Sequence, residues 1–431
     1  MLRTHYSTDV RPQQQVKVAG WVDEKRDLGG LVFVLLRDGR GRIQITAKKG
    51  NSLAERFKKL GKEDVISVEG RAVENASAPN GIEIVPASLD VLASVTDIIP
   101  IEMNEKIQTN LDKRLDYRCL DLRREQSQAI FRIQSMLIQE IQEFLRREGF
   151  FQVFTPCIMG VASESGSDVF PVVYYDKEAF LRQDPQLHRQ LTIAGGFERI
   201  YDVGPSWRAE PSHTTRHLCE HRTCAVEFAF IKDEHDVIQL EQEMVKSALK
   251  NLVKDCKTEL DALNVKIDVP DKFPVLEFPK IYDILEELGF KVESGNDYDS
   301  EQEKALGDYV KEKYNSDFFF VNRFPFAKKP FYVMRFDDDP QWARSTDLIY
   351  RGVELSSGGQ REHRYEKIIE QAKIKKMSPE SVAWFADFFK WAAPPHGGFA
   401  IGIERMTKQL LGLENIREAT LFPRDTNRLV P

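Results

Sequence analysis

Three short segments that lie far apart in the sequence carry side chains suited to binding a polyphosphate and a carboxylate. They are residues 207–210 (WRAE), 354–361 (ELSSGGQR) and 398–405 (GFAIGIER). Arginines neutralise phosphate charge, acids can hold Mg²⁺, and glycines permit close approach of a backbone. In-line attack on the α-phosphate of ATP needs this combination, because it depends on positioning and charge neutralisation. The chain has no Walker lysine loop and no GxGxxG motif after a strand, so no other nucleotide-binding motif competes.

The first segment leads into a basic loop, and the third ends in a further cation. Arg208 closes a hydrophobic stretch, and the turn-forming residues 211–217 that follow include Arg216 and His217. Such a loop could clamp three phosphates, with Arg208 on the α-phosphate and Arg216 or His217 on the γ-phosphate. Arg405, at a strand-to-helix junction, would lie across the base or the phosphates. Taken alone, Arg208 could equally be a surface salt-bridge partner, and only its context favours phosphate binding.

The second segment supplies hard oxygen ligands. Asp347, Glu354 and the hydroxyl of Ser357 suit a Mg²⁺ ion that bridges phosphates. The glycine pair at 358–359 would let Arg361 approach a bound carboxylate closely. An acidic strand edge followed by a glycine turn would look the same, so the segment alone leaves both interpretations open.

Length and composition describe an ordinary globular chain of two or three domains. It has 431 residues, of which 42% are hydrophobic and 30% are charged. The net charge of −7 does not indicate a nucleic acid partner. Its apolar runs are far shorter than the ~20 residues of a membrane span, and its first residues lack a signal-peptide core. Five cysteines without framework spacing are expected to be reduced thiols. We therefore expect a cytosolic protein.

Residues 1–103 are predicted to form a small closed β-barrel of the OB type. Hydrophobic and polar residues alternate in five short segments, with turns between them and a helical segment near 53–60. The predicted strands are 16–22, 31–36, 42–46, 65–70 and 82–85. Another small barrel or a meander would also satisfy this pattern.

Residues 104–126 are predicted to be a polar hinge, and residues 127–431 an α+β domain around a mainly antiparallel sheet. Apolar residues at three- and four-residue spacing predict an amphipathic helix over 127–147, which Gly149 ends. Further predicted helices are 237–253, 379–391 and 403–411, and further predicted strands are 200–203, 224–231, 331–335 and 352–355. Residues 255–325, rich in Lys, Glu and Asp, are expected to be an insertion or subdomain.

Together, the three chemistry-bearing segments resemble motifs 2 and 3 of the class II aminoacyl-tRNA synthetases, and residues 149–156 look like motif 1, the dimer-interface element. The resemblance runs nearly end to end and is nearest to aspartyl-tRNA synthetases of the archaeal and eukaryotic type. The segments that carry it are 19–22, 26–30, 114–118, 121–124, 350–354, 357–363, 394–398 and 421–425. It implies a class II catalytic domain on an antiparallel sheet, an N-terminal OB-fold anticodon-binding domain, and assembly as a homodimer.

The resemblance also implies a reaction. ATP, with Mg²⁺, would activate L-aspartate to an adenylate, and the acyl group would pass to the 3′ end of tRNA(Asp), with tRNA(Asn) as a second candidate. No side chain need act as a nucleophile, because the substrate carboxylate attacks phosphorus. By position, Glu210 matches the adenine-reading acid, and His221 falls where the family has an adenine-stacking Phe. The implied catalytic residues are Arg208, Glu354 and Arg405; the implied ATP-binding residues are Arg208, Glu210, Arg216, His217, His221, Glu354 and Arg405; and the implied metal ligands are Asp347, Glu354 and Ser357.

The implied amino acid pocket departs from the family pattern. Where the family usually has QSPQLYK, residues 183–189 read QDPQLHR, so Asp184 replaces a serine and Arg189 replaces the substrate-contacting lysine. The family's aspartate in the return strand of motif 2 falls on Ala225, although Asp184 could supply a partner for Arg189 instead. The implied amino acid-binding residues are Glu164, Gln186, Arg189, Ser357 and Arg361.

We expect aspartate to be the substrate despite these departures. The alternatives are a diverged paralogue that uses a modified or larger acidic amino acid, and an enzyme that amidates aspartate without tRNA. A non-catalytic nucleic acid binder is less consistent with the chain, because it would be expected to lose Arg208, Glu354 or Arg405.

The resemblance assigns anticodon reading to the barrel. Phe33 matches the aromatic residue that stacks on a base, Gln44 and Glu83 match the pair that hydrogen-bonds a central uracil, and Arg26 belongs to the same predicted set. The apolar neighbours of Phe33 make core packing the competing interpretation. The positions that separate enzymes strict for tRNA(Asp) from those that also charge tRNA(Asn) fall near Asp23 and Pro79 and do not decide the matter.

A cluster of histidines and cysteines could pass for a zinc site. Its members are His213, His217, Cys219, His221 and Cys224. The cluster overlaps the motif 2 loop, which must open for ATP, so a structural metal is not expected there.

Overall fold

The computed structural model describes residues 1–431 except 49, 51, 104–106, 108, 161–167, 210 and 212–213. Three residues singled out from the sequence, Glu164, Glu210 and His213, therefore lie outside the described residues. The chain divides into two compact units, Met1–Pro100 (unit 1) and Ile101–Pro431 (unit 2). Each unit has its own hydrophobic core.

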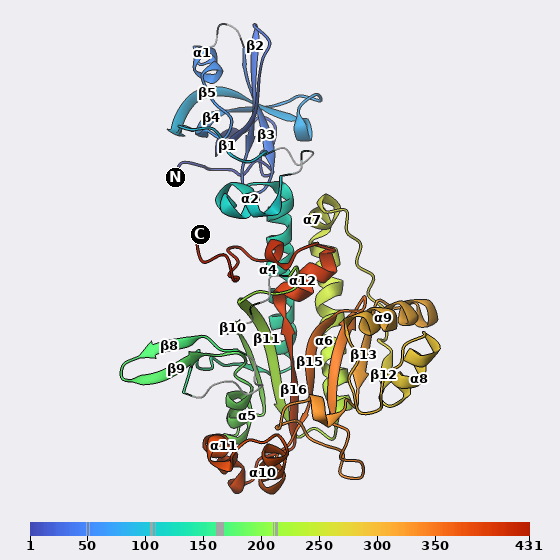
Figure 1. Ribbon diagram of the computed structural model, residues 1–431. Helices are drawn as coiled ribbons and strands as arrows, with labels where there is room; N and C mark the ends of the chain where they lie inside the picture. The colour runs from blue at the N-terminus through green and yellow to red at the C-terminus, as the bar shows by residue number, and fades with distance from the viewer. Residues whose placement is uncertain are drawn as a thin grey trace. The chain divides into compact units, whose positions relative to one another are not determined.

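Unit 1 is a closed five-stranded barrel with the strand order β1-β2-β3-β5-β4 (Figure 1). Its elements are β1 (Gln15–Asp27), β2 (Leu31–Arg37), β3 (Arg42–Lys48), α1 (Ala54–Lys58), β4 (Val65–Glu74), η1 (Pro79–Gly81) and β5 (Ile82–Ala93). The predicted alternation is present, since Val32, Val34 and Leu36 of β2 are buried in the barrel core. Phe33 and Leu35, between them, are partly exposed and lie outside that core.

Unit 2 is built on an eight-stranded sheet with the order β12-β13-β14-β15-β16-β11-β10-β6. Its strands are β6 (Phe151–Gln152), β10 (Arg199–Trp207), β11 (Glu220–Ala229), β12 (Val275–Glu277), β13 (Phe318–Asn322), β14 (Ser345–Tyr350), β15 (Glu354–Arg361) and β16 (His396–Gly402). Neighbouring strands are antiparallel except at the two edges, where β12 pairs with β13 and β6 pairs with β10 in parallel. The sheet is therefore mainly antiparallel, as predicted.

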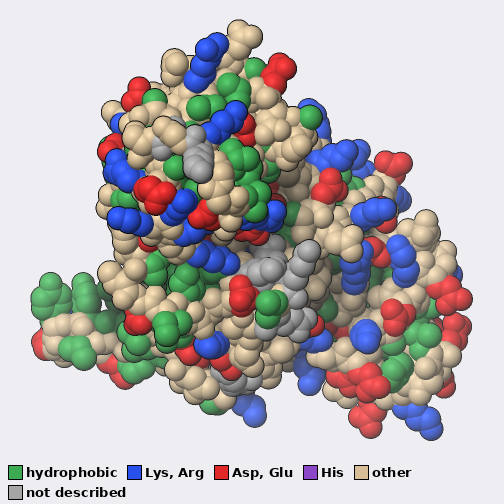
Figure 2. Space-filling model, turned by 90° about the horizontal axis from the view of Figure 1, so that it is seen from above, with side chains coloured by type: hydrophobic (Ala, Val, Ile, Leu, Met, Phe, Trp, Pro, Cys, Tyr) green, Lys and Arg blue, Asp and Glu red, His purple; other side chains and the backbone are tan. Residues whose placement is uncertain are grey.

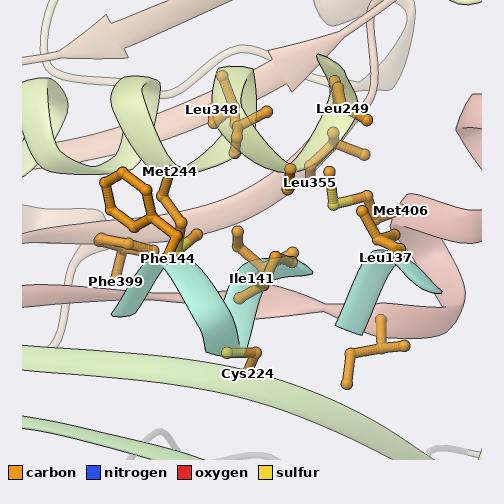
Figure 3. Close-up of a cluster of buried hydrophobic side chains, with 14 of the residues drawn as sticks. Leu137, Ile141, Phe144, Cys224, Met244, Leu249, Leu348, Leu355, Phe399 and Met406 are labelled. Atoms are coloured by element: carbon orange, nitrogen blue, oxygen red, sulfur yellow. The ribbon is translucent and has the colours of Figure 1, made fainter. Parts of the chain in front are cut away.

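Helices cover one face of this sheet. The helices of unit 2 are α2 (Leu111–Asp116), α3 (Arg118–Asp121), α4 (Glu125–Arg147), α5 (Gln186–Ala194), α6 (Glu234–Asp255), α7 (Lys257–Ala262), α8 (Lys280–Glu287), α9 (Ser300–Tyr314), α10 (Tyr365–Ile374), α11 (Pro379–Ala386) and α12 (Ile403–Leu411), with the 3₁₀ turns η2 (Phe326–Lys328), η3 (Asp387–Trp391) and η4 (Ile416–Ala419). Helix α6 packs on β14, β15 and β16, and α4 packs on α6, α7 and α12. Leu137 and Ile141 of α4 and Met244 of α6 meet Leu355 and Phe399 of the sheet in the main core (Figure 3). The opposite face of the central strands is left for the cleft described below.

A small second sheet projects from unit 2. It has the order β7-β9-β8 and is made of β7 (Ile158–Met159), β8 (Pro171–Tyr174) and β9 (Lys177–Leu181). The β8–β9 hairpin extends away from the body of unit 2 (Figure 1), and hydrophobic side chains gather on this projection in the space-filling view (Figure 2). Val173 and Tyr175 at its tip are 94% and 89% exposed.

The structure differs from the sequence-based prediction in several places, of which three concern the central sheet and its surroundings. Residues 331–335 form no strand and instead make only isolated bridges, Val333 to Arg361 and Arg335 to Ala343. The helix predicted over 379–391 is α-helical only to Ala386 and continues as the 3₁₀ turn η3. Strands β13 and β14 were not predicted, although both belong to the central sheet. Within 255–325, β12 and β13 extend that sheet, while α8 and α9 pack on them in a separate apolar cluster.

Residues 110–124 of unit 2 carry a buried charge network that ties them to the C-terminal segment. Arg118 is 1% exposed, donates to Asp121, and also donates to the carbonyls of Thr420 (2.7 Å) and Leu421 (2.9 Å). Arg114 and Arg124 donate to the same Asp121 carboxylate. Within unit 2 this part of the predicted hinge region is therefore fixed by hydrogen bonds that compensate the buried charges.

Candidate active site

A cleft of about 350 Å³ lies on the face of the central sheet opposite α6. It is lined by strands β11, β15 and β16, by residues next to β10 and at the start of α5, and by the segment around Lys329. Nine of the site residues predicted from the sequence line it together: Gln186, Arg208, Arg216, His217, His221, Glu354, Ser357, Arg361 and Arg405. Residues as far apart in the chain as Gln186 and Arg405 thus meet in one cavity.

The positions of residues along strand β15 define the two ends of the cleft. On β15, Glu354 begins the strand and Arg361 ends it, so these residues lie roughly 20 Å apart at about 3.3 Å per residue. We call these the Arg405 end, where Glu354 lies, and the Arg361 end. Between them a row of small side chains runs across the sheet in register, from Ala225 to Ala400 to Ser357. This row keeps the floor low and leaves room for a ligand.

Gly398 makes the Arg361 end possible. It stands opposite both Glu227 of β11 and Gly359 of β15. A Cβ atom at Gly398 would lie 1.9 Å from the carbonyl oxygen of Val226 and 2.6 Å from Oε2 of Glu227. The absence of a side chain therefore lets Glu227 and the guanidinium of Arg361 lie directly over the backbone.

Arg361 is held by a closed network of buried polar groups. Its Nε donates to Oε1 of Glu227 (3.0 Å), and its Nη2 donates to Oε1 of Gln186 (3.2 Å) and to the carbonyl of Gly398 (3.1 Å). The amide nitrogen of Gln186 donates in turn to Oε2 of Glu227 (2.9 Å). All three side chains are at most 5% exposed, so their orientation is fixed before any ligand arrives.

Arg189, the predicted substrate-binding cation, does not line the cleft. It is 1% exposed, and its two terminal nitrogens donate to Oδ1 (2.9 Å) and Oδ2 (2.7 Å) of Asp184. Nη2 also donates to Oε1 of Gln186 (2.7 Å). Asp184 does line the cleft, with 35% of its side chain exposed. Burial opposes ionisation of Asp184, but the charge and hydrogen bonds of Arg189 outweigh it, so the pKa of Asp184 is lowered.

The predicted metal ligands lie on adjacent strands. Asp347 of β14 is directly opposite Ser357 of β15, and its Oδ2 accepts a hydrogen bond from Lys329 (2.9 Å). Its buried Oδ1 has no hydrogen-bond partner among the described residues. Burial raises the pKa of Asp347 to about 6, and the charge of Glu354 adds to this against the effect of Lys329. Crowded carboxylates and an unpartnered buried oxygen fit a hard divalent cation such as Mg²⁺.

The Arg405 end collects three cations around a neutral ring. Nη1 of Arg405 donates to Oε1 of Glu354 (2.9 Å), and the backbone N–H of Arg208 donates to the carbonyl of Cys219 (3.0 Å). Burial lowers the pKa of His221 to about 4, and the nearby charges of Arg208 and Arg405 lower it further. A neutral imidazole between guanidinium groups suits stacking on a base, whereas Arg208, Arg216 and Arg405 suit phosphates.

Several residues that line the cleft, or that hold residues lining it, were not predicted. Lys329 neutralises Asp347, and Glu404 accepts the backbone N–H of Arg222 (2.9 Å) while burial raises its pKa. Glu303 of α9 accepts the backbone N–H of Glu354 (2.8 Å), and burial raises its pKa to about 7, with the Glu354 charge adding to the effect. Glu227 was also missed, although the apolar neighbours of this acid on a buried strand could have signalled it.

The histidine–cysteine cluster does not form a metal site in the part of the chain that the structure describes. No group of three or more His, Cys, Asp or Glu side chains is arranged there to hold a metal ion. Cys219, Cys224 and the other three cysteines are free thiols.

The barrel carries the four residues predicted to read an anticodon. Gln44 of β3 donates to Oε2 of Glu83 (3.0 Å), and Thr46 and Asn75 donate to the same oxygen. Burial opposes ionisation of Glu83, but these hydrogen bonds outweigh it and lower its pKa. Phe33 and Arg26 lie directly opposite each other on the paired strands β2 and β1. Asp23 accepts hydrogen bonds from Arg37 and Arg42.

Comparison with known proteins defines the class. Residues 110–426 match the family described as tRNA synthetases class II (D, K and N), and residues 16–92 match the OB-fold nucleic acid binding domain. The chain belongs to this class II synthetase family. The predicted fold class, a class II antiparallel-sheet domain with an N-terminal OB-fold barrel, is therefore confirmed. The chain is thus a ligase whose substrates are an amino acid, ATP and a tRNA.

Named relatives cover the whole chain. It is 43% identical over 438 residues to the aspartate–tRNA(Asp) ligase of Thermococcus kodakarensis and 42% identical to the aspartate–tRNA(Asp/Asn) ligase of Methanopyrus kandleri, with 100% of both chains covered in each case. Among solved structures, asparaginyl-tRNA synthetase from Pyrococcus horikoshii, complexed with asparaginyl-adenylate, matches with a TM-score of 0.93 and 32% identity over 100% of both chains. Within the described part of the chain, no helix has the length and hydropathy of a membrane span.

Proposed function

We propose that this chain is an aspartate–tRNA ligase, which activates L-aspartate with ATP and transfers it to the 3′ end of tRNA(Asp). The observation that carries the proposal is the cleft itself, which has a fixed arginine at one end and, at the other, three cations suited to phosphates together with a neutral imidazole. The full-length relatives named aspartate–tRNA ligases support it. Some of them are named for both tRNA(Asp) and tRNA(Asn), so tRNA(Asn) is a second candidate acceptor.

Each cleft residue has a role in this reaction. Arg361 binds the β-carboxylate of aspartate, because it is the buried cation that lines one end of the cleft. Arg208 neutralises the α-phosphate as the substrate carboxylate attacks phosphorus and pyrophosphate leaves. Arg216 and His217 hold the outer phosphates, and His221 stacks on the adenine. The role of Glu210 on the adenine and that of Glu164 near the amino acid follow from the family resemblance.

Asp347, Glu354 and Ser357 would hold Mg²⁺ at the side of the phosphates. The metal would supply charge neutralisation on the phosphate oxygens. Lys329 donates a hydrogen bond to Asp347, and Arg405 donates one to Glu354. Each of these carboxylates would therefore contact a cationic side chain as well as the metal. These two cations hold the carboxylates in place and offset their mutual repulsion.

Unit 1 is proposed to read the anticodon. The hydrogen bond between Gln44 and Glu83 orients two edge-reading groups, and the partly exposed Phe33 offers a stacking face near Arg26. We further propose a homodimer formed through residues 149–156, where Phe151 and Phe154 are 66% and 85% exposed. A cytosolic location fits the five free thiols.

The decisive experiment is exchange of pyrophosphate with ATP in the presence of each amino acid, followed by charging of tRNA. We expect exchange with L-aspartate, and we expect Arg208→Ala to abolish it while tRNA binding stays within a few fold. Lys280→Ala, which removes an exposed cation on α8 outside the cleft, is the control and should leave exchange unchanged. Exchange with another amino acid and not with aspartate would overturn the proposal, as would asparagine formation from aspartate, ATP and ammonia without tRNA.

A further inference from the structure

The Arg361 end of the cleft presents an acid to a ligand where the sequence suggested a cation. Arg189 lies behind the wall, with its terminal nitrogens occupied by Asp184 and Gln186. Asp184 stands in front of it and faces the cleft. A ligand that enters this end therefore meets the Asp184 carboxylate before it can reach the buried guanidinium.

The charges at this end are balanced before any ligand binds. Asp184 offsets Arg189, and Glu227 offsets Arg361, with Gln186 accepting a hydrogen bond from each arginine. A ligand with a single negative charge would gain little from such a neutral site. A ligand that carries both a cation and an anion, spaced to meet Asp184 and Arg361 separately, matches the arrangement.

The other acids of the cleft are committed elsewhere. Among the described residues that line it, the acids are Asp184, Glu354 and Glu404. Glu354 is paired with Arg405, and Glu404 is buried, has a raised pKa and accepts the N–H of Arg222. Of these three described acids, Asp184 is the one that lies at the Arg361 end.

We propose that Asp184 binds the α-ammonium group of the amino acid substrate, with Arg189 as the buried positioning residue that fixes the Asp184 carboxylate. Both oxygens of Asp184 accept from Arg189, so the carboxylate cannot rotate, and its remaining lone pairs point to the exposed side. Arg361 then receives the side-chain carboxylate through Nη1, which has no hydrogen-bond partner among the described residues. The inference rests on the proposed function, because it assigns contacts to the same substrate.

A substrate analogue that lacks only the ammonium group tests the assignment. Succinate is L-aspartate without the amino group, and it can be measured as a competitive inhibitor of aspartate-dependent pyrophosphate exchange. In Asp184→Asn we expect the KM for L-aspartate to rise about 10- to 100-fold, the range for losing a hydrogen bond to a charged group. The Ki of succinate should stay within about threefold or fall, and the KM for ATP should not change.

Arg189 is tested by substitutions that keep or remove its charge. Arg189→Lys retains one contact to Asp184 and should raise the KM for aspartate less than Arg189→Met does, with kcat changed less than KM in both. The matched control is Asp317→Asn, because Asp317 is also a buried aspartate bound by an arginine, Arg351, but lies outside the cleft. It should leave the KM for aspartate unchanged.

The outcomes separate the two proposals. If the wild-type protein shows no exchange with aspartate, the proposed function fails; if it does and Asp184→Asn weakens aspartate and succinate equally, the assignment of Asp184 fails. Tighter binding of aspartate by Asp184→Asn would also refute it, because Asp184 would then be competing with the substrate for Arg189. If Asp184→Asn does not fold, the double variant Asp184→Asn/Arg189→Met, which removes both charges together, carries the same expectation.

Discussion

Glu241 is a buried acid under the strand that forms the cleft floor, and its substitution should stabilise the protein in a pH-dependent way. It projects from α6, is 0% exposed, and accepts a hydrogen bond from the hydroxyl of Ser356 on β15. Its Oε2 has no hydrogen-bond partner among the described residues. Burial raises the pKa of Glu241 from 4.5 to about 8, and the charge of Asp347 adds to the effect.

Proton linkage determines whether stability rises or falls with pH. The folded pKa of Glu241 lies above the unfolded pKa, so the unfolded chain releases this proton first as pH rises, and stability is lost between about pH 4.5 and pH 8. At about 1.4 kcal/mol per pKa unit, the whole loss is roughly 5 kcal/mol. Glu241→Gln keeps the shape and removes the titration. We therefore expect the variant to exceed the wild type by about 1 kcal/mol at pH 5 and about 4 kcal/mol at pH 8.

Urea unfolding followed by tryptophan fluorescence measures this difference. Four of the five tryptophans, Trp207, Trp342, Trp384 and Trp391, lie in unit 2 with Glu241, so the signal reports mainly on that unit. Glu243→Gln on the exposed side of α6 is the control and should show no gap that grows with pH. A Glu241→Gln gap that is the same at pH 5 and pH 8, or that shrinks as pH rises, would refute the reasoning.

Two further predictions concern the cleft floor and the barrel. In Gly398→Ala, the added Cβ would collide with Val226 and Glu227. We therefore expect the unfolding temperature to fall by several degrees and aspartate-dependent exchange to be abolished. Retained exchange would contradict this expectation and would show that the strands adjust. Phe33→Ala should raise the KM for tRNA by about tenfold in a charging assay, which corresponds to about 1.4 kcal/mol of lost stacking. Pyrophosphate exchange, which does not need tRNA, should stay unchanged. An equal loss in both assays would show that Phe33 has a structural role instead.

Periodicity predicted the barrel strands and the long helix α4 well, because each has one buried and one exposed face. The failures occurred where that contrast is absent. All five residues of β13, Phe318–Asn322, are buried, so the strand has no alternation for the sequence to display. Residues 331–335 carry the apolar composition of a strand but only join β15 and the segment near Ala343 through isolated bridges. Their burial comes from tertiary packing, which local pattern does not contain.

The cleft shows the same division at the level of single residues. Arg361 and Glu354 were predicted because each stands beside a local signal, a glycine pair or an acidic strand start. Glu303 was not predicted, because its contact with the backbone of Glu354 joins two elements, α9 and β15, that only the tertiary fold brings together. The assignment of Arg189 shows a different limit. The sequence predicts a cation at this position and offers Asp184, just ahead of α5, as its partner, but only the fold shows that this pairing leaves Arg189 outside the cleft lining.

The buried position of Arg189 helps to explain how a site with no net charge can bind an acidic amino acid selectively. If Arg189 also faced the cleft, without Asp184 as its partner, the site would hold an unpaired buried cation that would attract phosphate as readily as a carboxylate and would carry a large desolvation cost. Pairing Arg189 with Asp184 converts this cation into the support for an anion. Arg361 keeps a free donor although Glu227 offsets its charge. Selection then depends on the spacing between an ammonium group and a carboxylate within one ligand, and ATP cannot satisfy that requirement.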